Sequence, residues 1–359
     1  MNKKFIVWQL KRWIVPLSIF LGVITLMFVL AVMSADIYQG EGYYTLLSGS
    51  SILLSPMMTA ILISGIFPLV VFSYKFGMQR CDFYNQLPFK PKEFKRTIML
   101  LGLICVLVVV IVGYALGISI FALYYAISPA TKTVTTYMGD LLLQKIKYNW
   151  GAVFYSLLYL ILICSATYFI SSCIVYNNIG IFESIICIAL FHIAASSVAL
   201  AIQVRLVHYQ VIESFESLAF GVFPMIVYGN LFDTMFGGEK VELAKEFYIN
   251  CGVYITLAAG GFAWTWLEKD RSAEIDNTKG EPKLFPIIVL HAGFLFGLAL
   301  VDALVLELGA PLLGLVLWAL SMVAYFFLNV LYKHGFGLQM KQWIPMIPIM
   351  ALTFALCFF

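Results

Sequence analysis

Long continuous apolar runs recur along the 359-residue chain and limit its fold more than any other feature. The run from Thr97 to Leu123, for example, contains no charged residue. About 20 apolar residues cross a bilayer as a helix, and only helices or closed barrels satisfy their backbone groups in lipid. The runs are continuous and do not alternate, so helices are expected. With 62% apolar and 11% charged residues, against about 25% charged in soluble domains, the chain is predicted to be an all-α polytopic membrane protein.

Nine transmembrane helices with a cytoplasmic N-terminus fit the sequence best. Their approximate ranges are 14–32, 54–74, 97–123, 152–175, 179–204, 248–266, 284–306, 311–332 and 343–359. This topology leaves most of the 22 Lys and Arg residues on the cytoplasmic side, as the positive-inside rule requires. The first six helices would form a core, residues 1–266, and residues 267–359 would add a cytoplasmic loop and C-terminal transmembrane helices.

The longest stretch between predicted spans is the segment 205–247. Its middle, residues 217–236, is apolar but includes Asp233, so its free energy of membrane insertion is near zero. A full crossing there would also place the basic loop with Lys269 and Arg271 outside, against the positive-inside rule. We therefore expect the segment to be re-entrant or interfacial on the outer face.

The N-terminus mixes basic and aromatic residues. Lys3, Lys4, Lys11 and Arg12 alternate with apolar residues that include Trp8. This mixture is typical of a helix in the inner headgroup region, with its cations toward anionic lipids. An ordinary basic flank that sets the orientation would give the same pattern, and both interpretations can hold together.

A basic stretch, Lys75–Arg96, lies between the second and third predicted helices. Its position indicates the cytoplasmic side, because Lys and Arg resist translocation. Residues from Asp82 to Glu93 predict a short helix, a proline stop and the start of the next span. The stretch is therefore a candidate docking surface; the alternative is a basic turn that only sets the topology.

Common enzyme signatures are missing from the sequence. It contains no Gly-Lys dipeptide, so it has no Walker A loop, and it contains no His-Glu-x-x-His, Gly-x-Ser-x-Gly or Cys-x-x-Cys pattern. The chain is predicted to have no catalytic residues, no metal site, no cofactor of its own and no nucleic-acid partner. If the protein uses ATP, another chain must bind it.

Few ionisable residues fall within the predicted spans. They are Glu183 and His192 in the fifth helix and His291, Asp302 and Glu307 in or near the seventh. Such residues are functional hypotheses by default. Glu183 and His192 lie too far apart along the helix to touch, Glu183 is close to a cytoplasmic turn, and a lone His can bond a neighbouring carbonyl. A proton relay is therefore the weaker interpretation.

Two Gly-x-x-x-Gly patterns, Gly113/Gly117 and Gly293/Gly297, permit close approach of helices. In a chain with 26 glycines the pattern has low specificity. Internal packing is favoured over a dimer seam.

The segment CDFYNQLPFKPKEFKR resembles the segment after the second helix of type-2 ABC transporter permeases. In that family an acid and an aromatic residue precede a Leu-Pro pair and a basic run, often with Arg where this chain has Lys. The matching positions are Asp82, Tyr84, Leu87, Pro88, Lys92 and Lys95. A second stretch, WLEKDRSAEIDNTKG, followed by paired helices and YKHGFGLQMKQW, is similar to the sixth-helix end and C-terminal extension of permeases encoded in Firmicute ABC exporter operons.

The resemblance implies a permease subunit of an ATP-driven ABC exporter in the bacterial cytoplasmic membrane. It also implies separate cytoplasmic ABC ATPase subunits that carry ATP-Mg, and a second permease, either the same or a homologous chain. The residues expected to couple to the ATPase are Arg80, Asp82, Phe83, Tyr84, Leu87, Pro88, Asn177 and Asn178. The few charges in helices two and five favour an amphipathic, peptide-like or lipid-like substrate.

Other classes of membrane protein make different demands on the sequence. A membrane-embedded enzyme needs clustered His, Asp or Glu side chains, whereas those of this chain are dispersed. An ion-coupled secondary transporter needs paired intramembrane charges and an inverted repeat, and neither is evident. A non-transporting sensor or scaffold subunit is the third alternative.

Overall fold

The computed structural model describes residues 3–34, 38–40, 43–45, 50–76, 91–127, 150–177, 180–192 and 245–267, with a few helical positions between 316 and 354. The chain divides into two compact units. The first consists of Met1–Cys173 and Pro224–Glu274, and the second of Ile174–Phe223 and Ile275–Phe359. The predicted boundary between a core and C-terminal helices stays a prediction.

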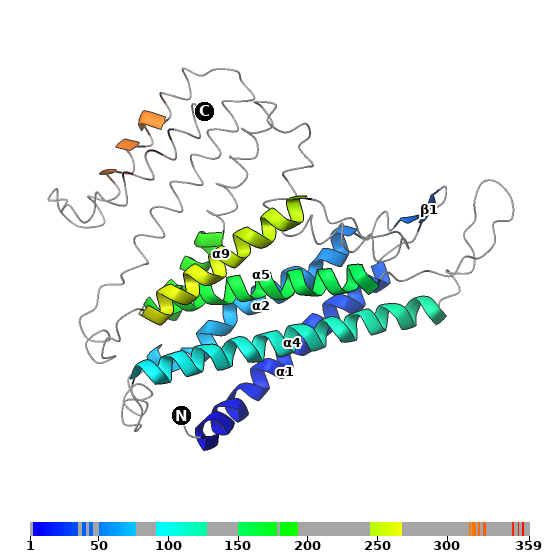
Figure 1. Ribbon diagram of the computed structural model, residues 1–359, viewed down its shortest axis with the longest axis horizontal. Coiled ribbons are helices and arrows are strands. Elements are labelled where there is room, and N and C mark those ends of the chain that lie inside the picture. Colours follow the sequence, from blue (N-terminus) through cyan, green and yellow to red (C-terminus); the bar gives the residue numbers. More distant parts are fainter. Residues whose placement is uncertain are drawn as a thin grey trace. The chain divides into compact units, whose positions relative to one another are not determined.

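Long helices build the first unit (Figure 1). They are α1 (Lys3–Ser34), α2 (Ser50–Val71), α4 (Pro91–Ile127), α5 (Trp150–Asn177, in this unit up to Cys173) and α9 (Lys245–Leu267). A short 3-10 helix, η1 (Ser73–Phe76), follows α2, and the strands β1 (Tyr38–Gly40) and β2 (Tyr43–Thr45) form an antiparallel hairpin between α1 and α2. Apart from this hairpin, which the all-α expectation did not include, the described elements are helical.

Three described helices are long and apolar enough to cross a membrane: Lys4–Ala31, Lys92–Leu123 and Trp150–Asn177. Shorter apolar helices are Pro56–Val71, Ile181–His192 and Cys251–Leu267. The three long helices indicate a membrane protein, and all six described helices overlap the first six predicted spans. The predicted spans seven to nine and most of the segment 205–247 lie outside the described residues, so the count of nine and the cytoplasmic N-terminus stay predictions.

Two helices begin ahead of the apolar runs that mark the predicted spans. The basic N-terminal segment and the first predicted span form one continuous helix, α1, which includes Pro16. Helix α4 begins at Pro91, ahead of the apolar run that starts at Thr97 and within Asp82–Glu93, where the sequence predicts the start of the next span. Proline is well tolerated at the first helical position, where its missing N–H has no intrahelical partner, and Glu93 in the first turn complements the helix dipole. The last residues of the basic stretch are therefore helical.

Helices α1 and α4 run in the same direction, and two glycines bring them together. Ile24 of α1 lies against Gly113 of α4, and Phe28 lies against Gly117 one turn further on. A Cβ atom at Gly113 would lie 2.8 Å from a methyl carbon of Ile24, which is closer than carbon atoms pack. The ring of Phe28 also meets the edge of Tyr114 (centroids 6.2 Å apart). The first Gly-x-x-x-Gly pattern therefore makes an internal seam, and the prediction of internal packing is confirmed for this pair.

Helix α2 packs on both α1 and α4. Val71 lies near Gly102, and Tyr74 of η1 meets Phe94 near the start of α4, so α2 and η1 run opposite to α4. Phe67 is fully buried among these helices. The first three helices of the unit therefore alternate in direction as the predicted topology requires.

Helix α5 runs opposite to α4 and is joined to it by hydrogen bonds near both ends. The Tyr168 hydroxyl donates to the carbonyl oxygen of Met99 (2.8 Å). At the other end the hydroxyls of Tyr114 and Ser156 are hydrogen-bonded (2.5 Å). All four residues are buried, so each hydroxyl finds its partner within the protein.

Helix α9 lies beside α5 and runs in the same direction. Tyr254 faces Tyr159 (centroids 6.2 Å apart), and Phe262 faces Phe169 further along both helices (5.3 Å). A Cβ atom at Gly261 would lie only 3.0 Å from backbone atoms of α5, so a glycine permits this close approach. The start of α9 therefore lies toward the same end of the bundle as the start of α5.

Candidate functional site

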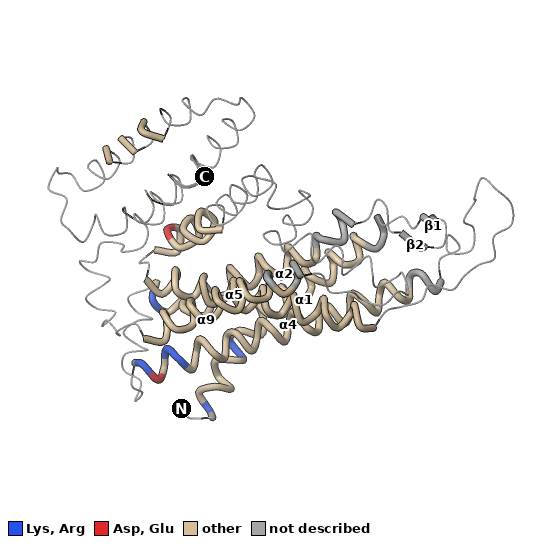
Figure 2. The backbone as a smooth tube through the Cα atoms, turned by 45° about the horizontal axis from the view of Figure 1, so that its top comes forward, with Lys and Arg blue, Asp and Glu red and all other residues tan. Residues whose placement is uncertain are grey.

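Every Lys and Arg whose side chain is described in the first unit lies at one end of the bundle (Figure 2). These residues lie in the first three turns of α1, in η1 and in the first two turns of α4: Lys4, Lys11, Arg12, Lys75, Lys92, Lys95 and Arg96. Glu93 is the one acidic side chain described in this unit. One end of the bundle is thus strongly positive while its described middle is uncharged, which is the distribution expected of a cytoplasmic end.

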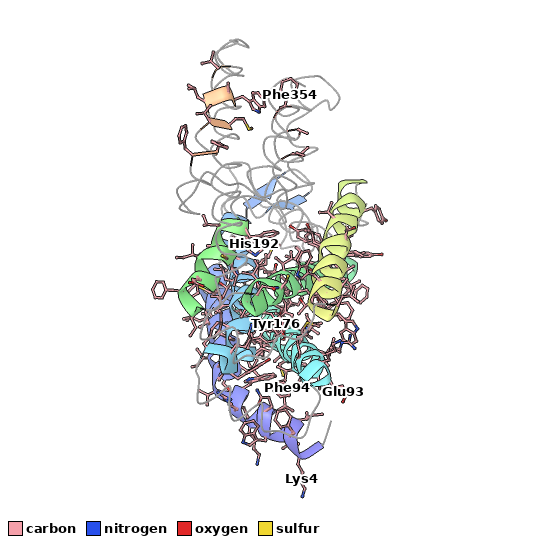
Figure 3. All side chains as sticks on the ribbon, turned by 90° about the vertical axis from the view of Figure 1, so that its left-hand side faces the viewer. Lys4, Glu93, Phe94, Tyr176, His192 and Phe354 are labelled. Carbon is pink, nitrogen blue, oxygen red and sulfur yellow. The ribbon has the colours of Figure 1, made fainter. Side chains whose placement is uncertain are left out.

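An aromatic contact joins three elements at this basic end. The ring of Phe94 near the start of α4 meets Phe5 of α1 (centroids 5.6 Å apart) and Tyr74 of η1 (5.4 Å), both edge-on. Edge-to-face geometry is favourable for aromatic pairs. Figure 3 shows Phe94 turned into the bundle and Glu93 turned away from it, in agreement with the burial of Phe94 and the exposure of Glu93.

Arg96, half a turn after Phe94, connects α4 to α9. Its Nη2 atom donates to the carbonyl oxygen of Trp266 (3.1 Å), and its Cζ atom lies 4.1 Å from the centroid of the Trp266 ring. Trp266 is the penultimate residue of α9. The start of α4 is therefore a junction, formed by Phe94 and Arg96, that contacts α1, η1 and α9. We call it the α4 junction.

The described part of the basic stretch Lys75–Arg96 is only partly exposed. Lys92 is exposed, Arg96 is half-buried and Lys95 is 2% exposed. Lys95 therefore lies inside the protein, although it belongs to the stretch that the sequence marks as a candidate docking surface. Helical periodicity could have signalled this, because Lys95 precedes the buried residues Ile98 and Met99 by about one turn.

Most residues predicted to couple to an ATPase lie outside the described residues: Arg80, Asp82, Phe83, Tyr84, Leu87, Pro88 and Asn178. Asn177 is the last residue of α5 and is half-buried. The predicted role of these residues stays a prediction. The described residues add Phe94, Arg96 and Trp266, which sequence reasoning did not single out.

The two ionisable residues of the fifth predicted helix have separate environments in the second unit. The Glu183 carboxylate accepts a hydrogen bond from the backbone N–H of Gly180 (3.3 Å) at the start of the helix Ile181–His192. This is half of a capping box, and Ser184 adds a hydroxyl bond to the Gly180 carbonyl (2.8 Å). The buried Nε2 atom of His192 has no hydrogen-bond partner among the described residues. The capping bond gives Glu183 a structural role.

Clusters of ligating side chains do not occur in the part of the chain that the structure describes: no group of three His, Cys, Asp or Glu residues there could hold a metal ion. The α4 junction instead consists of aromatic and cationic side chains that pack against one another. The chain matches no protein-family model, no curated protein and no solved structure. The likeness to type-2 ABC permeases therefore depends on the motifs quoted from the sequence.

Proposed function

We propose that the chain is the transmembrane permease subunit of an ATP-driven ABC exporter in the bacterial cytoplasmic membrane. Separate ABC ATPase subunits bind ATP-Mg on the cytoplasmic side, and a second permease, identical or homologous, completes the pathway. The cargo is amphipathic, peptide-like or lipid-like. The observation that carries the proposal is the α4 junction, because Phe94 and Arg96 are among the last residues of the segment whose sequence resembles the ATPase-coupling segment of such permeases.

Helix directions support a six-helix exporter core. Helices α1 and α4 begin at the basic end, whereas α2, α5 and α9 end there. This pattern is expected if helices one and three leave the cytoplasm and helices two, four and six return. Because α5 and α9 run in the same direction, the proposed core requires an odd number of crossings between them. One crossing by the predicted fifth helix, followed by a non-crossing segment 205–247, meets that requirement.

The proposed coupling mechanism depends on the two elements, η1 and α4, to which the segment 77–90 is attached. This segment follows η1 and precedes α4, and the contact between Tyr74 and Phe94 holds those two attachment points together. A force applied to the segment when two ATPases close on ATP therefore acts first on the start of α4. Helix α4 is continuous over 37 residues, so a tilt at its start is carried across the membrane.

Purification of the tagged chain from its native membrane tests the proposal. We expect an ABC ATPase, identified by mass spectrometry and by ATP hydrolysis, to co-purify in stable stoichiometry. Absence of any ABC ATPase from a complex that is otherwise intact would contradict the proposal and favour a sensor or scaffold subunit.

The double substitution Asp82→Ala with Leu87→Ala tests the coupling segment. We expect it to reduce ATPase co-purification at least about tenfold, because an interface residue that dominates binding contributes about 2 kcal/mol or more. Gly22→Ala is the control, since a Cβ atom at Gly22 meets nothing within 4 Å. If the double variant retains the ATPase and its ATP-driven export, the docking segment lies elsewhere.

A further inference from the structure

Arg96 caps the end of a helix other than its own. The last four carbonyl groups of an α-helix have no intrahelical partner, and the carbonyl of Trp266 is one of them in α9. The Nη2 atom of Arg96 donates to this oxygen over 3.1 Å. A cation at this position also meets the negative end of the α9 dipole. The contact joins residues 170 positions apart in the chain.

The same guanidinium stacks on the Trp266 ring, with its Cζ atom 4.1 Å from the ring centroid. Trp is the aromatic residue that binds cations best, and the planar guanidinium can stack and donate a hydrogen bond at the same time. A lysine ammonium is a compact point charge and cannot reproduce both contacts. A residue needed only to mark the cytoplasmic side would not require this geometry, because Lys serves that purpose equally well.

Trp266 is itself held by α5 through a second ring. Its indole lies against Phe262 (centroids 5.0 Å apart), and Phe262 meets Phe169 of α5. Thr265, the preceding residue, is the one fully buried side chain among those described in α9. Among the described contacts, α9 is thus held most tightly at its C-terminal end.

We propose that Arg96 is an interhelical lock between the start of α4 and the end of α9. The lock joins the C-terminal end of α9 to the start of α4. A displacement of the start of α4 therefore also displaces that end of α9, and the rest of α9 tilts relative to its locked end. The coupling role rests on the proposed function, because it assumes that an ATPase displaces the segment before α4. The lock itself does not depend on that assumption.

Amide hydrogen exchange on the purified chain in nanodiscs tests the lock. In Arg96→Gln and in Trp266→Leu we expect exchange in the last two turns of α9 to rise about threefold or more, because both variants free the same helix end. The double variant should show a smaller rise than the sum of the two single ones, since both single variants lose the same stacking contact. Unchanged exchange of α9, or effects that add in the double variant, would overturn the lock.

Two conservative variants and one control make this test robust to misfolding. Trp266→Phe keeps a ring on Phe262 but binds a cation less strongly, and Arg96→Lys keeps the charge without the planar group. Both should fold and should give intermediate exchange; wild-type exchange in both would overturn the lock. Lys11→Gln removes a cation from the same basic end and should leave α9 unchanged.

The coupling role is tested on the permease–ATPase complex with a non-hydrolysable ATP analogue. In the wild-type complex we expect the analogue to change the exchange of α9; in Arg96→Gln this response should disappear while the ATPase stays bound. A response that persists in Arg96→Gln overturns the coupling role and leaves the proposed function intact. If the wild-type chain carries no ATPase, the proposed function is overturned. The lock is then still tested by amide hydrogen exchange on the purified chain without an ATPase.

Discussion

The α1–α4 pair and the α5–α9 pair are both parallel helix pairs, but they are held together in different ways. In the first pair, Gly113 and Gly117 receive side chains of α1 along a continuous seam. In the second pair, Gly261 lies against the α5 backbone near one end, and most of α9 remains exposed. Side-chain packing is the main force between helices in lipid. We therefore expect the first pair to be more rigid than the second.

The largest expected effect is a difference in cysteine labelling between the starts of α4 and α5. It tests whether the α1–α4 pair and the α5–α9 pair run in opposite directions. Single cysteines replace Lys92 at the start of α4 and Trp150 at the start of α5, both exposed, in a background without the native cysteines. A membrane-impermeant maleimide should label position 150 in intact cells and position 92 only after permeabilisation. The reverse pattern would invert the topology, and labelling of both positions from one side would break the antiparallel arrangement.

A smaller but substantial effect is expected for Gly117→Ala in the α1–α4 seam. Its Cβ atom would overlap the Phe28 ring, and overpacking costs about 1–3 kcal/mol. Gly22→Ala on α1 is the matched control, since its Cβ atom meets nothing within 4 Å and alanine favours a helix over glycine by up to about 1 kcal/mol. Thermal unfolding in detergent, followed by size-exclusion chromatography, should rank Gly22→Ala above wild type and Gly117→Ala below it. Equal midpoints for the two variants would show that the seam is not tight.

The smallest effect is expected in the α5–α9 pair, where two adjacent glycines provide the comparison. Gly261→Ala brings a Cβ atom to 3.0 Å from the α5 backbone, whereas Gly260→Ala meets nothing within 4 Å. Because α9 can move away from α5, we expect Gly261→Ala to cost about 1 kcal/mol at most, less than Gly117→Ala. The same unfolding assay measures both. A larger cost at Gly261 than at Gly117 would reverse the inferred difference in rigidity.

Sequence reasoning located the helices well and the contacts poorly. The apolar runs predict the ranges of α2, α5 and α9 to within a few residues, because membrane insertion depends on local composition. The apolar run alone begins at Thr97, but the proline stop within Asp82–Glu93 indicates an earlier helix start, in agreement with the start of α4 at Pro91. The hairpin between α1 and α2 was missed. Short strands depend on pairing between segments, and composition alone does not reveal that pairing.

The α4 junction shows most clearly which side-chain contacts the sequence does not predict. Its basic character is evident from Lys92, Lys95 and Arg96, yet the three side chains have different environments. Lys92 faces outward, Lys95 is buried, and Arg96 reaches α9. Helical spacing alone does not separate the first two, because residues three apart lie on the same side of a helix. No local pattern predicts the third, since its partner Trp266 is 170 positions away.

By itself, the sequence determined that this chain is a helical membrane protein with a strongly basic side, because lipid accepts only long apolar helices and cations resist crossing it. The tertiary structure decided which helices are neighbours. It assigned Gly113 and Gly117 to an internal seam with α1, and it brought Arg96 to the end of α9. Neighbours depend on how side chains of distant segments fit together, and that complementarity becomes visible only when the helices are packed.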